Sequence, residues 1–244
     1  MNKTIIVMPV ANEEKTMQEV IDKIMALPYD ELYLYPVIDS YSKDRTEEII
    51  RNAEETYNGR VKCIFHEGST GLISCYLYGF TRALEDNAEF VIEMDGGGSH
   101  DPAELPQFID NLEKGYDCVW GSRFVKGGSI SNHPLYRRML SSGGTFLSNL
   151  ILHTRLKDMT SGYEAFNADV LKQMDLGKFL STGHMYQTEM RFYCKDFNTI
   201  EVPITYIGGD SSLKPKAVVE AIKLLFKLKK NRKNVFIKKE VSQK

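Results

Sequence analysis

The 244-residue sequence has no apolar run that approaches the ~18 residues a membrane-spanning helix needs, so we expect no transmembrane helix. It has only four cysteines, which show neither CxxC spacing nor nearby histidine pairs. We therefore expect free thiols in a reducing compartment and no cysteine-based metal or redox centre. The first residues do not resemble a signal peptide, because a single lysine and a short strand-like run are soon followed by Asn12 and Glu13.

Further absences narrow the class of protein. No segment matches the GxGxxG or Walker loops, which excludes the two commonest nucleotide-binding motifs. The sequence contains no internal repeat and no low-complexity linker, so we expect one domain over residues 1–213 and a tail over residues 214–244. The composition, 42% hydrophobic and 26% charged, is that of a folded globular protein.

The net charge of the chain is only −2, but it is unevenly distributed. Residues 214–244 contain eleven lysines and arginines and two acidic residues, a net charge of +9. The first 213 residues carry 20 basic and 31 acidic groups. A basic tail on an acidic body indicates an anionic partner for the tail: a membrane surface, nucleic acid or a phosphate-bearing ligand.

Strand-like and helical segments alternate over the first hundred residues. We expect strands at 4–8, 32–38, 61–65 and 89–94, and helices at 13–27, 44–57 and 71–84. Further strands are expected at 117–120 and 199–204, and further helices at 135–152 and 185–194. Successive βα units favour an α/β fold with a mostly parallel sheet covered by helices on both faces.

Polar, loop-like segments follow three of the expected strands. The first strand ends in PVANEE, the second in DSYSKD and the fourth in DGGGSHD. Ligands of such sheets bind beyond the carboxyl ends of the strands, so these segments predict a site at one edge of the sheet.

Seven blocks occur in one order along the chain: PVANEE, VIDSYSKDRT, EMDGGGSHDP, GSRFVKGGSI, DMTSGYEAF, MYQTEM and EVPITY. This series, over roughly residues 4 to 216, resembles the family 2 glycosyltransferases, and among them the dolichyl- or polyprenyl-phosphate mannosyltransferase-like group. The resemblance implies a GT-A fold, which is Rossmann-like with a mixed, mostly parallel sheet. It also implies a nucleotide-sugar donor and an inverting transfer.

The resemblance assigns roles on the donor side of the site. Asp95 stands where the family's Asp-x-Asp metal motif begins, so it is the predicted ligand of a divalent metal, Mg²⁺ or Mn²⁺, and a catalytic residue. Such a cation stabilises the charge that grows on the leaving diphosphate. Nucleotide contacts are implied for Pro9, Ala11, Glu13, Asp39 and Lys214.

On the acceptor side, arginines at the positions of Arg123 and Arg137 bind the phosphate of a lipid acceptor in the resembling group. A planar, permanently charged guanidinium suits a phosphate dianion. Gln187 and Glu189 lie on the helix expected to flank the acceptor pocket, and Asp158 opens the loop before it. Arg123, Asp158 and Glu189 are therefore predicted catalytic residues, and Gln187 is a predicted acceptor contact.

The chemical class of the acceptor decides whether a base is needed. A hydroxyl acceptor requires a general base, for which Asp158, Glu189 and Asp101 are candidates. A lipid phosphate is already ionised at neutral pH and requires only positioning and charge balance. Arg123 and Arg137 favour a lipid phosphate as the acceptor.

Several positions depart from the family's pattern, and they fall in the site. The second aspartate of the metal motif is replaced by Gly97, and the second acid after strand two by Ser40. Ser69 and Thr70 stand where the family has a basic residue before the third helix. Gly208 or Gly209 stands where the family has an arginine that faces the diphosphate.

These departures leave three alternatives open. Asp95 holds the metal alone or with His100, since Mg²⁺ commonly takes only one or two carboxylates plus substrate phosphates. In the second alternative, the enzyme acts without a metal and uses the charges of Lys214 and Arg123. In the third, the protein has lost sugar transfer and only binds its ligand.

Residues 217–230 have the spacing of an amphipathic helix. Glu220, Lys223, Lys227 and Lys230 share one face, opposite an apolar stripe of Val218, Ala221, Ile222, Leu225 and Phe226. This helix either lies on an anionic membrane surface near a lipid acceptor or packs on the domain. Nucleic-acid binding is not expected, because stacking aromatics are not interleaved with the basic residues.

We therefore predict an inverting glycosyltransferase that moves a sugar from a nucleotide sugar to polyprenyl or dolichyl phosphate. The protein is expected in the cytoplasm, peripherally attached to the membrane. Expected partners are the donor, the lipid phosphate, the membrane surface and a membrane protein. The alternatives are transfer to a glycan hydroxyl, and a catalytically silent subunit that only binds a nucleotide sugar.

Overall fold

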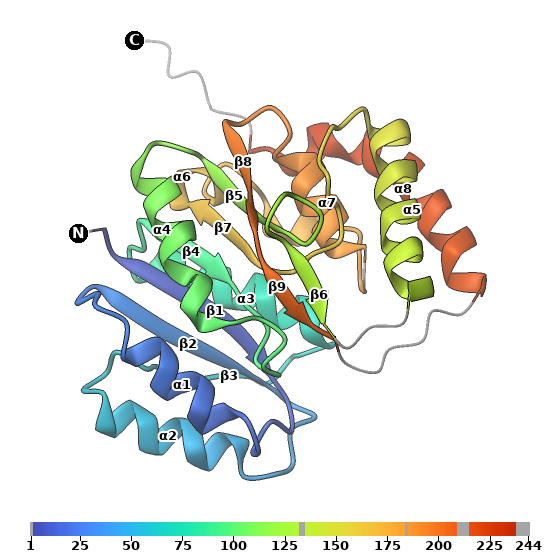
Figure 1. Cartoon of the computed structure of the whole chain (residues 1–244). Coiled ribbons are helices and arrows are strands. Elements are labelled where there is room, and N and C mark those ends of the chain that lie inside the picture. Colours follow the sequence, from blue (N-terminus) through green and yellow to red (C-terminus); the bar gives the residue numbers. More distant parts are fainter. Residues whose placement is uncertain (1, 132–134, 184, 209–214, 238–244) are drawn as a thin grey trace.

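The chain folds around a seven-stranded sheet. A computed structural model describes residues 2–131, 135–183, 185–208 and 215–237 (Figure 1). The strands of the sheet are β1 (Thr4–Val10), β2 (Leu32–Asp39), β3 (Ile64–His66), β4 (Phe90–Glu93), β5 (Cys118–Ser122), β7 (Glu164–Asn167) and β8 (Thr199–Pro203). They are arranged in the order β3-β2-β1-β4-β7-β5-β8. A separate pair, β6 (Ser129–Ser131) and β9 (Thr205–Ile207), extends the second half.

The sheet is mixed and mostly parallel, as the sequence predicts. Strands β1 to β4 pair in parallel, as do β5 and β8. Only β7 runs antiparallel to its neighbours, and it lies between β4 and β5. Sequence reasoning did not find this short strand, which joins the two halves of the sheet.

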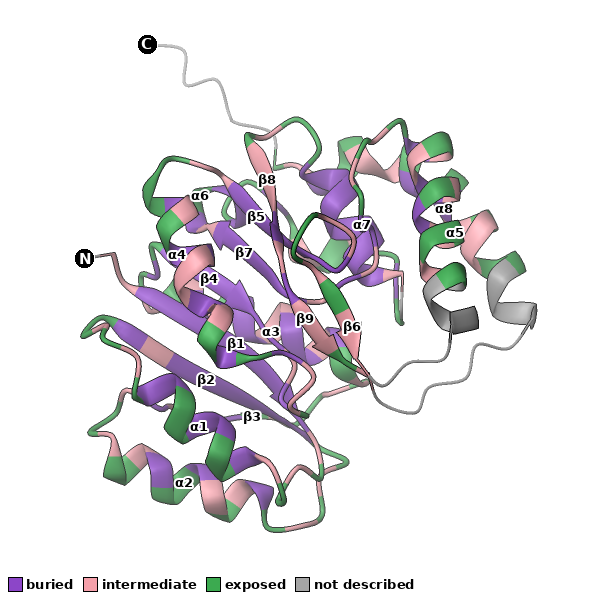
Figure 2. Ribbon diagram, viewed as in Figure 1, coloured by how far each residue is buried: buried purple, intermediate pink, exposed green. Residues whose placement is uncertain are grey.

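Helices cover both faces of the sheet. Successive side chains of β1 point to opposite faces, and each set packs against a different group of helices. Ile6 and Met8 point into a core shared with α1 (Met17–Met25), α2 (Thr46–Thr56) and α4 (Leu105–Glu113). Ile5 and Val7 point into the opposite core, shared with α3 (Leu72–Glu85), α5 (Leu135–Leu152), α7 (Tyr186–Tyr193) and α8 (Pro215–Val235). The short elements are η1 (Pro102–Glu104), α6 (Ala168–Leu171) and η2 (Leu176–Lys178). Figure 2 shows the central strands as the most buried part of the molecule.

The expected elements are present with shifted bounds. Helix α5 spans the expected residues, but α1 begins only at Met17, because the carbonyl of Glu13 accepts the backbone N–H groups of Thr16 and Met17 in a preceding turn. Strand β3 begins at Ile64 instead of residue 61. Helix α4 and strands β6, β7 and β9 were not predicted.

The basic C-terminal helix packs on the domain. Leu225, Leu228 and Val235 of α8 are buried and belong to the core that includes α5 and α7. Figure 1 shows α5 and α8 side by side, and the contacts between them agree. Lys227 and Phe226 remain exposed, so the outer face of α8 is free to meet another surface.

A fully buried guanidinium connects α7 to the sheet. Nε of Arg191 donates to Oε1 of Glu164 on β7 at 2.7 Å. The other nitrogens of Arg191 donate to the backbone carbonyls of Gly121, Asp158 and Ser161. The side chain of Arg191 thus joins α7 to β5, to β7 and to the loop that precedes β7.

Replacing Arg191 by methionine removes the partner of Glu164 and of three carbonyls. We expect Arg191→Met to lower the free energy of unfolding by about 3–5 kcal/mol in urea denaturation, because it leaves buried polar groups unpaired. The control is Arg51→Met, which breaks the exposed pair of Arg51 with Glu47 and costs about 0–1 kcal/mol. Equal losses in the two variants would contradict the structural role of Arg191.

Candidate active site

The carboxyl ends of β1, β2 and β4 meet at one edge of the sheet, as predicted. The backbone N–H of Asn12 donates to Oγ of Ser42 at 3.2 Å, and that of Glu13 donates to Oγ1 of Thr46 at 2.8 Å. These bonds join the segment after β1 to the segment after β2. Asn12 has a φ of 57°, a left-handed conformation that asparagine tolerates better than most residues.

The ends of β1 and β4 approach closely. A Cβ at Gly96 would lie 2.5 Å from Cγ1 of Val10 and 3.1 Å from the carbonyl oxygen of Pro9. Only glycine fits there without movement, so the backbones of the two strand ends lie against each other. Pro9 is buried in this contact, and Ala11 is half-buried just beyond it.

Asp39 is buried at the end of β2. Its Oδ1 accepts the backbone N–H of Tyr41 at 3.1 Å, which closes the turn after the strand. This bond engages one carboxylate oxygen. The predicted nucleotide contact of Asp39 stays a prediction.

Asp95 follows β4 and is positioned by two side chains. The hydroxyl of Tyr76 on α3 donates to Oδ1 of Asp95 at 2.7 Å. The backbone N–H of Asp95 donates to Nδ1 of His100 at 3.2 Å, and Nε2 of the same ring lies 3.9 Å from Oδ2 of Asp95. Burial lowers the pKa of His100, although Asp95 opposes the shift. Tyr76 was not predicted, although a tyrosine on the apolar face of an expected helix needs a hydroxyl partner.

The carboxylate of Glu13 faces the same edge. Oε2 accepts the hydroxyl of Thr16 at 3.2 Å. Partial burial is the main cause of a raised pKa for Glu13; the Thr16 bond opposes it, and the charges of Asp44 and Asp95 raise it further. Oε1 lies 3.1 Å from the position that a Cβ at Gly97 would take. Glu13 therefore lies beside the position where the family has its second aspartate.

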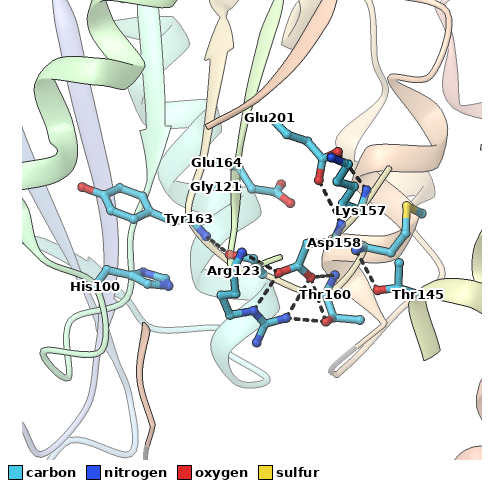
Figure 3. A network of polar contacts seen from close by, with 12 residues as sticks. His100, Gly121, Arg123, Thr145, Lys157, Asp158, Thr160, Tyr163, Glu164 and Glu201 are labelled. Carbon is cyan, nitrogen blue, oxygen red and sulfur yellow. Dashed lines mark hydrogen bonds and ion pairs between the residues drawn. The ribbon is translucent and has the colours of Figure 1, made fainter. Parts of the chain in front are cut away.

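Arg123 and Asp158 form a buried ion pair (Figure 3). Nε and Nη2 of Arg123 donate to the two carboxylate oxygens at 2.7 and 2.8 Å, and the backbone N–H of Arg123 adds a third bond at 3.1 Å. Nη2 also donates to Oγ1 of Thr160 at 2.6 Å. Burial favours the neutral carboxyl, but the hydrogen bonds and charge of Arg123 outweigh it and lower the pKa of Asp158 to about 2.

Two predicted residues lie on α7 in different surroundings. Nε2 of Gln187 is 3.2 Å from the position of a Cβ at Gly162, and that position is 3.8 Å from Oδ1 of Asp95, so Gln187 lies near the Asp95 site. Glu189 is fully buried and accepts the backbone N–H groups of Leu180 and Ser181 and the hydroxyl of Tyr193. Glu189 thus holds the segment before α7; its catalytic role stays a prediction.

Other predicted residues cannot be placed in the site. Lys214 and Gly209 lie outside the described residues, and so does the side chain of Arg137, although its backbone belongs to α5. Among the described residues, no group of three or more histidines, cysteines, aspartates or glutamates is arranged to hold a metal ion. A cation here would need substrate oxygens to complete its shell.

Residues 5–175 match the family model "Glycosyl transferase family 2". The chain therefore belongs to glycosyltransferase family 2, and it is a glycosyltransferase.

Similar proteins agree with this assignment. The chain is 31% identical to the polyprenol monophosphomannose synthase of Mycolicibacterium smegmatis over 84% of its own length and 77% of that protein. It is 31% identical to the undecaprenyl-phosphate mannosyltransferase of Micrococcus luteus, over 90% of the chain and 91% of that protein. A structure of glucosyl-3-phosphoglycerate synthase from Mycobacterium tuberculosis, solved with Mn²⁺ and UDP, has a TM-score of 0.65 at 13% identity, covering 97% of this chain and 82% of that one. The fold is GT-A.

The low pKa of Asp158 makes a pH-dependent contribution to stability. A carboxyl whose pKa falls from 3.8 to about 2 on folding stabilises the fold above pH 4, and this contribution is lost as the pH falls toward 2. We expect the difference in unfolding free energy between wild type and Asp158→Asn to shrink by about 2 kcal/mol between pH 6 and pH 2. Urea denaturation at several pH values measures it. A difference that does not change with pH would mean that Asp158 is not held ionised by Arg123.

Proposed function

We propose that this glycosyltransferase moves a sugar, with inversion, from a nucleoside diphosphate sugar to a polyprenyl or dolichyl phosphate at the cytoplasmic face of a membrane. Two relatives support a lipid-phosphate acceptor, since one is a polyprenol monophosphomannose synthase and the other an undecaprenyl-phosphate mannosyltransferase. The order of the motif blocks along the sequence supports the nucleotide-sugar donor.

The observation that carries the acceptor proposal is the pairing of Arg123 with Asp158. A buried Asp158 that is held ionised by two bonds from Arg123 is a poor general base, because its pKa is about 2. Glu189 accepts three hydrogen bonds, and Oδ1 of Asp101 accepts the backbone N–H of Ala103 at the start of η1. All three candidate bases thus accept hydrogen bonds within the protein, and Asp158 and Glu189 are buried, which supports an acceptor that needs no base.

Arg123 contacts the acceptor phosphate in this proposal. Asp158 and Thr160 hold the Nε and Nη2 edge of the guanidinium, so that the group is oriented before the acceptor arrives. Among the described residues, none hydrogen-bonds to Nη1, which is the nitrogen proposed to meet the phosphate. Arg137 and Gln187 complete the proposed acceptor contacts.

On the donor side, the nucleotide is proposed to contact Pro9, Ala11, Glu13 and Asp39, with Lys214 toward the diphosphate. Asp95 fits a divalent cation, since Tyr76 binds only its Oδ1 and hard oxygen ligands suit Mg²⁺ and Mn²⁺. A bound cation would supply charge neutralisation to the leaving diphosphate. Tyr76 holds the Asp95 carboxylate through Oδ1, and His100 fixes the backbone of the same residue by accepting its N–H.

The outer faces of α5 and α8 form the proposed membrane contact. Phe146 and Leu150 on α5 are 71% and 62% exposed, and Phe226 on α8 is 56% exposed. Exposed lysines, Lys223, Lys227 and Lys230, line α8. Apolar side chains beside lysines suit an anionic lipid surface or a membrane protein embedded in it. No helix in the described part of the chain has the length and hydropathy to cross a bilayer.

Arg123 variants test the acceptor assignment. We expect Arg123→Lys, which keeps a cation beside Asp158 but loses the two-pronged geometry, to raise the KM for polyprenyl phosphate at least about tenfold and to leave the donor KM nearly unchanged. Arg155→Lys, at an exposed arginine, is the control and should change neither constant. A selective rise in the donor KM would move Arg123 to the donor side.

Lysine neutralisation tests the membrane contact. Each basic residue near an anionic surface contributes about 1 kcal/mol, so Lys223→Gln, Lys227→Gln and Lys230→Gln together should weaken binding to anionic vesicles by about two orders of magnitude. Sedimentation with phosphatidylglycerol vesicles measures the affinity of each variant for an anionic membrane. The control neutralises three exposed lysines in or near α1 and α2, Lys15, Lys23 and Lys43. Equal binding by both triple variants would assign the surface to a protein partner.

A further inference from the structure

The carboxylate of Glu13 fills the space that Gly97, two residues after Asp95, leaves open. Oε1, the carboxyl carbon and Oε2 of Glu13 lie 3.1, 3.6 and 3.7 Å from the position of a Cβ at residue 97. Gly97 has no left-handed φ, so its backbone conformation would accept other residues. The glycine thus serves to make room for Glu13.

The backbone and side chain of Glu13 are both held. Its N–H donates to Oγ1 of Thr46 at 2.8 Å, and its carbonyl accepts the N–H groups of Thr16 and Met17 at 3.0 and 2.9 Å. The hydroxyl of Thr16 binds Oε2 at 3.2 Å. Oε1, the oxygen nearest to Gly97, accepts no hydrogen bond from the described residues. Glu13 therefore presents one positioned carboxylate oxygen where a side chain at residue 97 would begin.

A separate observation indicates that a ligand belongs at Asp95. The ring of His100 is fully buried, and its Nδ1 accepts the backbone N–H of Asp95, so the proton of the neutral ring lies on Nε2. Nε2 has no hydrogen-bond partner among the described residues and lies 3.9 Å from Oδ2 of Asp95. A buried donor without an acceptor is unfavourable, so an acceptor is expected at this site when the ligand is bound.

We propose that Glu13 supplies the second carboxylate for the divalent cation held by Asp95, in place of the aspartate that Gly97 lacks. Two nearby carboxylates repel each other, and a divalent cation removes that repulsion. This inference rests on the proposed metal-dependent donor binding. It gives Glu13 a role on the cation in place of the nucleotide contact that the motif resemblance implies.

Mn²⁺ binding tests this assignment without measuring catalysis. Electron paramagnetic resonance reports free Mn²⁺ during titration of the full chain, alone and with saturating GDP or UDP. We expect Glu13→Gln to weaken Mn²⁺ binding at least about tenfold, since even the loss of an outer-shell partner of a metal site costs 10–100-fold. Glu14→Gln, at the exposed neighbouring position, is the matched control and should bind like wild type. Thermal unfolding checks that each variant is folded.

Restoring the missing aspartate provides the reciprocal test. In Glu13→Ala, the space beside residue 97 is free, so adding Gly97→Asp should recover most of the lost Mn²⁺ affinity. In the presence of Glu13, Gly97→Asp places a third carboxylate against an occupied position and should not give a comparable gain. Recovery only in the Glu13→Ala background indicates that the two carboxylates occupy one site.

The outcomes separate this inference from the proposed function. If Asp95→Asn weakens Mn²⁺ binding while Glu13→Gln does not, the role of Glu13 is overturned and the proposed function stands. If Glu13→Gln weakens nucleotide binding equally with Mn²⁺ and with EDTA, Glu13 contacts the nucleotide and the inference is again overturned. If the wild type binds no Mn²⁺ yet transfers sugar in EDTA, the cation assignment fails while the transferase function remains.

Discussion

The fully buried guanidinium of Arg191 is the constraint on which the second half of the structure depends. It donates to Oε1 of Glu164 on β7 and to three backbone carbonyls, including that of Asp158. Without Arg191 the carbonyls would lose a charged donor and Oε1 of Glu164 would be buried without a partner, and an unpaired buried polar group costs about 1–3 kcal/mol. The short antiparallel strand β7 and the loop that begins at Asp158 are therefore fixed relative to β5 and α7.

The site is built in steps from that constraint. Because the loop is fixed, Asp158 can hold Arg123 at the end of β5, and the aromatic rings of Phe124 and Tyr206 lie 5.4 and 5.5 Å from its guanidinium. On the donor side, Tyr76 plays the corresponding part for Asp95. Each charged group that is proposed to meet substrate is thus oriented by a neighbour, which reduces the reorganisation needed when substrate binds.

Hydrophobic periodicity predicts the first half of the fold well, because each βα unit is local in sequence and the carboxyl ends of parallel strands must share one edge. The sequence therefore predicts that the segments carrying Glu13, Asp39 and Asp95 follow strands that end at one edge of the sheet. Strand β7 has only four residues and pairs with strands distant in sequence, so periodicity does not reveal it. The pairing of Arg123 with Asp158 spans 35 residues, so the sequence did not reveal it, and Asp158 was predicted only as a catalytic residue and candidate base.

The acceptor in the proposed reaction is a lipid phosphate that needs no general base. The most direct measurement compares sugar transfer from a panel of nucleotide sugars to polyprenyl phosphate and to the matching polyprenol, which has a hydroxyl in place of the phosphate. We expect transfer to the phosphate and no detectable transfer to the alcohol. Comparable transfer to the alcohol, with a rate that rises through the titration of a carboxylate, would contradict it.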